Sequence, residues 1–190
     1  MRHDNSTLTL SLEACETRMD LLETYTRADN LIIKGLPAVY SEAVHASANT
    51  DSSGDPLIEN SDATMGVVLQ FCENSLDVQV YPTDISIAHR LPKGKYDKTQ
   101  PVIVRFTNRR ARHAVFTAGR KLHEAGVQGI YVKEHLTRHH DNLFAACRNL
   151  RNAKKIFSTW TWHGITYVKL SQSSRMVKIL SSDDIDKITT

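Results

Sequence analysis

The chain has 190 residues, of which 41% are hydrophobic and 24% are charged, so it can bury an ordinary core and is not disordered by composition. Its formal net charge is only +3, no apolar run approaches the roughly 20 residues of a membrane helix, and Met1 is followed by polar residues rather than an apolar signal core. We therefore expect an intracellular protein without a transmembrane helix.

The charges are distributed very unevenly along the chain. Residues 90–178 contain 19 Lys or Arg against 4 Asp or Glu, whereas the rest of the chain contains 5 against 17. Such asymmetry favours a basic surface that binds a polyanion, with nucleic acid as the leading candidate, and acidic segments that serve another purpose. The alternative is a solvated surface of mixed charge.

The three cysteines, Cys15, Cys72 and Cys147, are odd in number and far apart in the sequence. Each lies among apolar residues at helical spacing, so we expect small buried side chains and no disulfide framework.

The N-terminal segment, residues 1–28, is predicted to be an amphipathic helix. Its apolar residues step by four, three, four and three, which is typical of a coiled-coil seam, and they are Leu8, Leu12, Cys15, Met19 and Leu22. We expect a homo-oligomer formed through residues 8–26. A single amphipathic helix that caps the domain is the alternative, because the seam is shorter than three heptads.

Two strands and one helix are predicted in the next part of the chain. Alternation places Leu31 and Ile33 on one face of a strand at 30–36, and Ile85 and Ile87 on one face of a strand at 84–90. Between them, residues 38–60 are rich in turn formers and indicate a long loop, and a helix follows up to Leu76.

A third strand leads directly into an arginine-rich helix. In QPVIVRFTNRRARHAVFTAGRKL (residues 100–122), Val102, Val104 and Phe106 alternate with Arg105, and an apolar stripe then recurs at helical spacing. Arg109, Arg112 and Arg120 lie off that stripe, so this helix is predicted to present positive charge outward.

A fourth strand at 130–133 completes the order β-α-β-β-α-β, which predicts a ferredoxin-like domain over residues 29–134. Residues 135–190 are predicted to form a smaller α+β domain. It begins with a helix at Leu136–Thr137, continues with strands at 157–162 and 165–170 joined at His163-Gly164, and ends with a strand at 177–180 and a short helix.

One face of the predicted four-stranded sheet is uncovered and basic. If the helices cover the apolar residues, their sequence neighbours must lie on the other face, and these include Lys34, Arg90, Arg105, Tyr131 and Lys133. Four cations and one aromatic ring suit a single strand of phosphates and bases. Trp160 and Trp162 are either further stacking platforms or core residues.

Several short motifs, taken in order, resemble one known family. They are NLIIKGLP at 30–37, AHRLP at 88–92, PVIVRFTN at 101–108, Arg120-Lys121, KEHLT at 133–137 and WHGITYVK at 162–169. The set is similar to the RNA-binding protein encoded by the first open reading frame of LINE-type retrotransposons, with its transposase-22-like domains, and the similarity spans about residues 8–185. RNA-recognition motifs in general carry aromatic residues at the positions held here by Ile32, Pro101 and Ile103.

The resemblance implies a trimerising coiled coil, an RNA-recognition-like domain and a small C-terminal domain. It further implies a single-strand nucleic-acid binder and chaperone in ribonucleoprotein particles, cytoplasmic or nuclear, with RNA or single-stranded DNA as the partner. Arg90 and Arg105 would lie in a cleft between the two folded domains. Further basic residues would surround them, namely Arg109, Arg110, Arg120, Lys121, Arg138, Arg148, Arg151, Lys154 and Lys155.

Catalytic chemistry is not predicted. His135, His139 and His140 invite a zinc interpretation, but no fourth ligand follows at a suitable spacing, so we interpret them as surface residues near a nucleic-acid site. Phosphate loops, serine elbows and paired carboxylates are absent from the basic half, and we expect no cofactor, no metal and no enzyme activity. The alternative functions are a protein-interaction adaptor that acts through the acidic N-terminal helix and, more remotely, a nuclease or helicase.

Overall fold

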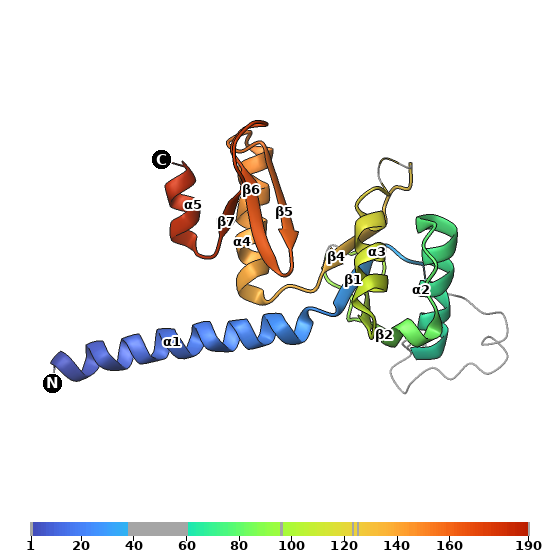
Figure 1. Cartoon of the computed structure of the whole chain (residues 1–190), viewed down its shortest axis with the longest axis horizontal. Coiled ribbons are helices and arrows are strands. Elements are labelled where there is room, and N and C mark those ends of the chain that lie inside the picture. Colours follow the sequence, from blue (N-terminus) through green and yellow to red (C-terminus); the bar gives the residue numbers. More distant parts are fainter. Residues whose placement is uncertain (1, 38–60, 96, 123, 125, 190) are drawn as a thin grey trace. The chain divides into compact units, whose positions relative to one another are not determined.

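The computed structural model describes residues 2–37, 61–95, 97–122, 124 and 126–189, and its fold is α+β, with five α-helices and two antiparallel sheets in those ranges. The chain divides into two compact units, which we describe separately (Figure 1). The central unit comprises residues 29–133, and the terminal unit comprises residues 1–28 and 134–190. The predicted loop at 38–60 lies outside the described residues.

The central unit is built on a four-stranded sheet. Its strands lie in the spatial order β2-β3-β1-β4, and β3 pairs antiparallel with both β1 and β2. The strands are β1 (Asn30–Lys34), β2 (Ile85–Arg90), β3 (Val102–Phe106) and β4 (Tyr131–Glu134), close to where the alternation of apolar residues predicted them.

Two helices cover one face of this sheet. Helices α2 (Ser61–Leu76) and α3 (Arg109–Gly119) contribute side chains such as Val68 and Val115 to the same core as Leu31, Ile33 and Val104, all fully buried. A short 3-10 turn, η1 (Pro82–Asp84), precedes β2. Because both helices pack on one side, the opposite face of the sheet carries no helix of this unit.

The turn after β1 requires a glycine. Gly35 has a φ of +87°, and a Cβ at this position would lie 1.9 Å from the carbonyl oxygen of Gly129. Any side chain would therefore force apart the ends of β1 and of the segment that enters β4.

The predicted alternation in β2 is wrong beyond Ile85. A bulge lies between Ile85 and Ile87, so that Ile87 is 44% exposed while Ala88 is fully buried in the core. An extra residue in one strand reverses which side chains face the core from that point on. The bulge therefore also turns Arg90 toward the helix-covered side, where it lies opposite Val102.

The terminal unit contains the second sheet, which has three antiparallel strands. Strands β5 (Ser158–Trp162), β6 (Ile165–Lys169) and β7 (Val177–Ile179) lie in that order. Helix α4 (Arg138–Asn152) packs its Leu143 and Cys147 against Val168 and Ile179, and the partly buried Ile185 of α5 (Ser182–Thr189) joins this core.

Two local predictions are confirmed in this unit. Thr137 caps α4, since its hydroxyl accepts a hydrogen bond from the backbone N–H of His140 at 3.3 Å. His163 and Gly164 both have positive φ, of 50° and 77°, and join β5 to β6 in a two-residue turn. Two successive residues of positive φ match the right-handed twist of a hairpin.

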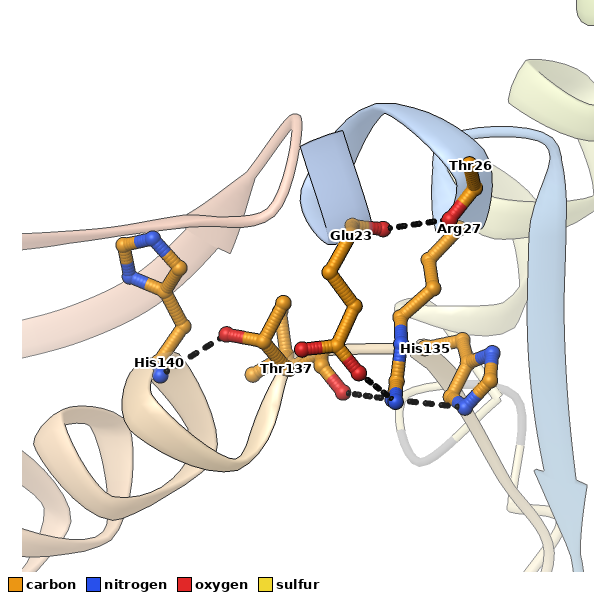
Figure 2. Close-up of polar contacts among 7 residues, drawn as sticks. Glu23, Thr26, Arg27, His135, Thr137 and His140 are labelled. Carbon is orange, nitrogen blue, oxygen red and sulfur yellow. Dashed lines mark hydrogen bonds and ion pairs between the residues drawn. The ribbon is translucent and has the colours of Figure 1, made fainter. Parts of the chain in front are cut away.

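Helix α1 (Arg2–Arg27) contacts the segment that leads into α4. The Arg27 guanidinium donates to the carbonyl of Leu136 at 2.6 Å, lies 2.9 Å from Nε2 of His135 and also pairs with Glu23 (Figure 2). A single guanidinium thus ties the last turn of α1 to the rest of the terminal unit.

The prediction that His135, His139 and His140 are all surface residues is wrong for His140. It is only 5% exposed, and its Nε2 lies 3.2 Å from the Asp20 carboxylate of α1. Its Nδ1 is buried without a hydrogen-bond partner among the described residues. This pattern fits a neutral ring that donates from Nε2, because a protonated Nδ1 would be left buried and unsatisfied.

Candidate nucleic-acid interface

The uncovered face of the central sheet is the candidate site. The register pairs Arg105 with Asn30 on one side and with Ile87 on the other, and pairs Ile103 with Ile32 and His89. Aliphatic side chains therefore occupy the middle of the face, and polar side chains surround them. The face comprises Asn30, Ile32, Lys34, Ile87, His89, Ile103, Arg105, Tyr131 and Lys133.

Arg105 lies where the alternation predicted it. It lies near the centre of the face, because β3 is flanked by β1 and β2. Its side chain is exposed and makes no hydrogen bond or ion pair with any described residue. The strand fixes its Cα, while the guanidinium remains able to form two parallel hydrogen bonds to a phosphate.

Lys34 also lies on this face, but it already has a partner. Its Nζ donates to Oδ1 of Asp97 at 2.7 Å, and the two side chains are 36% and 19% exposed. This hydrogen bond, with a smaller electrostatic contribution from Lys133, lowers the pKa of the Asp97 carboxyl below its ordinary value. A phosphate that binds Lys34 must therefore compete with an ionised carboxylate.

Arg90 does not belong to the face, and the prediction that it stands beside Lys34 and Arg105 is wrong. It is 7% exposed, and its guanidinium donates to the backbone carbonyls of Leu36, Pro37 and Gln100 at 2.6–3.2 Å. Those bonds satisfy carbonyls at the end of β1 and before β3. Arg90 is therefore a buried support for the sheet, and a role in the cleft implied by the resemblance is withdrawn with it.

Tyr131 begins β4 at the edge of the sheet and is 63% exposed. It lines a hollow of about 640 Å³ together with the exposed cations Arg120 and Lys98. An exposed phenol ring that shares a hollow with two cations combines a stacking surface with phosphate partners. Lys98 was not among the predicted site residues, although it lies in the basic loop at 91–100 that the sequence displays.

The remaining basic residues of the central unit differ in their surroundings. Arg109, Arg110 and Lys121 are all exposed, and Arg109 also pairs with Asp29 at 2.9 Å. Arg112, predicted to point outward, is instead 7% exposed and lies over the Phe116 ring at 5.2 Å. Sequence spacing places Arg112 off the apolar stripe of α3 and so predicts an exposed side chain. Its aliphatic stem and its cation–π contact account for its burial.

The basic residues predicted in the terminal unit are all exposed along α4 and just after it. Arg148 lies over the ring of Phe144 at 5.2 Å, and Lys154 adopts a φ of 58° in the turn that ends the helix. These residues, which are Arg138, Arg148, Arg151, Lys154 and Lys155, form a second group of cations within their own unit.

A comparison with protein-family models finds no match, and a comparison with curated proteins finds none.

In the described part of the chain, no three His, Cys, Asp or Glu residues are grouped so that they could hold a metal ion. No helix within the described ranges is long and apolar enough to cross a membrane.

Proposed function

We propose that the protein binds single-stranded nucleic acid, RNA in the first instance, with little preference for sequence, and acts as a chaperone in a retrotransposon ribonucleoprotein particle. The observation that carries the binding proposal is Arg105, exposed and without a described partner near the centre of an uncovered sheet face. The chaperone role and the particle rest on the resemblance of the motifs to the LINE-type family. We propose no catalytic activity.

The order β2-β3-β1-β4, with both helices on one face, supports an RNA-recognition-like, ferredoxin-like arrangement of the central unit. Such sheets bind single strands on the uncovered face. Here the two central strands carry Ile32 and Ile103 in place of the usual aromatic side chains, and of the two only Ile103 is partly exposed, because Ile32 is 8% exposed. Stacking in the centre is therefore replaced by aliphatic contact, and the phosphate contacts supply the larger share of the affinity.

The test is a titration of fluorescently labelled oligonucleotides, single-stranded and duplex, RNA and DNA, followed by anisotropy at several salt concentrations. The proposal expects similar affinities for unrelated single strands, weaker duplex binding, and a linear fall of log affinity with log salt of about 0.7 per phosphate contacted. Affinity for one sequence only, or affinity that does not depend on salt, would contradict it.

A homo-oligomer through residues 8–26 is the partner we propose for α1. The seam of α1 is solvent-exposed within the terminal unit, with Leu8, Leu12, Met19 and Leu22 each at least 60% exposed. Apolar side chains at coiled-coil spacing are stabilised when a second helix covers them. The resemblance implies a trimer.

The same exposed seam favours the second candidate function, a protein-interaction adaptor that pairs α1 with another protein. Light scattering of the purified chain after RNase treatment separates the two. A defined oligomer that Leu12→Asp dissociates supports self-association, and Arg18→Ala, at an exposed position of the same helix, serves as the control. A monomer whose mass is unchanged by nuclease would favour the adaptor.

A further inference from the structure

The sheet of the terminal unit has its own uncovered face, and this face carries aromatic rings. Helix α4 and the core lie against Val168 and Ile179, so alternation directs the neighbouring side chains to the opposite side. On that side Trp160 and Tyr167 are directly paired across β5 and β6. Their rings are stacked, with centroids 6.1 Å apart and an interplanar angle of 16°.

Both rings are partly exposed, and neither makes a hydrogen bond with a described residue. A core tryptophan or tyrosine normally buries its ring and finds a partner for its polar atom, whereas this pair keeps the indole N–H and the phenol O–H accessible to water. The sequence left open whether Trp160 is a core residue, and this alternative is wrong.

Cations stand beside the stacked pair. Trp160 lines a hollow of about 490 Å³ with Lys169, Arg175 and Met176. Neither Lys169 nor Arg175 has a side-chain partner among the described residues, and residues 142–182 contain seven Lys or Arg and no Asp or Glu. The face therefore lacks acidic side chains of its own sheet that would repel phosphates.

We propose that this face, the Trp160–Tyr167 face, is a second binding surface for single-stranded nucleic acid. A base stacks on the outer side of the ring pair, because centroids 6.1 Å apart leave no room for a base between the rings, and phosphates pair with Lys169 and Arg175. An unpaired strand is the occupant that fits best, since a duplex hides the flat faces of its bases and carboxylate side chains alone offer no ring to stack on the indole. The inference rests on the proposed function and adds a stacking surface to it.

The sequence offers a direct probe of this surface. The chain contains two tryptophans, Trp160 and Trp162, and both lie in β5. The variant Trp162→Phe makes Trp160 the only tryptophan in the full chain. Its emission, titrated with unlabelled oligothymidylate, therefore reports stacking on this face alone, while anisotropy of a labelled oligonucleotide reports binding anywhere.

Binding with quenching of the Trp160 emission is the expected result. In the full chain, the double variant Lys169→Ala with Arg175→Ala should weaken binding about tenfold at low salt and lower the salt slope by about 1.4, or 0.7 for each lost phosphate contact. Both positions are on the rim of the sheet, so the fold should survive. Arg18→Ala with Lys187→Ala, which removes two cations from α1 and α5, is the matched control.

Each other outcome overturns the inference in a recognisable way. Anisotropy that reports binding without quenching, and that the double variant leaves unchanged, would refute this face while leaving the proposed function intact. Equal quenching by duplex DNA or by polyglutamate would refute the single-strand assignment. Failure of every oligonucleotide to bind would refute the proposed function and this inference together.

Discussion

The uncovered faces of the two sheets differ in where they place aromatic and charged side chains. The central sheet has Ile32 and Ile103 on its inner strands and Tyr131 at its edge, whereas the terminal sheet has the stacked pair of Trp160 and Tyr167 across its first two strands. The cations beside this pair, Lys169 and Arg175, lie at the rim of the terminal sheet. If both faces bind nucleic acid as proposed, the chain separates charge-dominated contacts on one sheet from stacking contacts on the other.

Cations of the central unit also differ, because some are exposed and able to bind a phosphate while others are buried and support the sheet. The sequence predicts the same role for Arg105 and Arg90, as cations of one sheet face. In the structure Arg105 is exposed, whereas Arg90 donates hydrogen bonds to three backbone carbonyls. A charge count of the basic half cannot separate the two roles. Burial and hydrogen bonding do so at once.

The largest effect is expected from Arg90→Ala. The change leaves the carbonyls of Leu36, Pro37 and Gln100 without this donor, of which the bond to Leu36 is buried and the other two are partly buried. Because it also removes a buried guanidinium from the sheet, we expect a loss of unfolding free energy of about 3 kcal/mol. Urea unfolding followed by circular dichroism measures the loss, and hydrogen exchange of β1 and β3 locates it in the central unit. Arg105→Ala, an exposed arginine of the same sheet, should change stability by less than about 0.5 kcal/mol. Equal effects would show that Arg90 is not a support.

Acid should weaken the terminal unit before the central one. Burial lowers the pKa of His140, outweighing the opposite effect of Asp20, while His139 and Lys178 lower it further. As the pH falls, His140 in the unfolded chain therefore takes up a proton before His140 in the folded chain. Stability that is present above the ordinary pKa of about 6.5 is lost as the pH falls toward and through the lower pKa of the folded state. For Asp97 in the central unit the corresponding loss begins only near pH 4, because that lowered pKa belongs to a carboxyl.

Unfolding midpoints between pH 7.5 and pH 5, followed by tryptophan emission, report on the terminal unit because both tryptophans lie in β5. The midpoint should fall with acid in the native chain and much less in His140→Gln. A midpoint that rises with acid would mean that the Asp20 pair stabilises a charged ring.

Much of this organisation follows from the sequence because it depends on local chemistry. Turn residues such as His163-Gly164, the cap at Thr137 and the alternation in β3 each act within a few residues, and their elements appear where predicted. Two of the side chains placed wrongly, Arg90 and His140, depend on distant partners or on a bulge, whereas Arg112 is buried beside Phe116 of its own helix. Arg90 needs the bulge and carbonyls 53 and 54 residues away, and His140 needs Asp20 from the other end of the unit. The sequence contains no local signal for either.

The smallest effect is expected from Asp97→Asn. The change removes the carboxylate that pairs with Lys34 and frees this lysine for a phosphate, so single-strand affinity should rise about two- to fivefold at low salt, with a salt slope steeper by up to about 0.7. Anisotropy measures both quantities. Asp183→Asn, an exposed acid of α5, should have a smaller effect. Unchanged affinity would mean that Lys34 lies outside the path of the strand.

Arg105 is the proposed phosphate contact on which binding to the central face depends most. The most direct test is the salt dependence of single-strand binding by Arg105→Ala, compared with Arg18→Ala, which removes the same charge from an exposed position on α1. We predict that Arg105→Ala weakens binding to all sequences alike and lowers the slope by about 0.7, while Arg18→Ala changes neither. Identical slopes and affinities for the two variants would contradict the account.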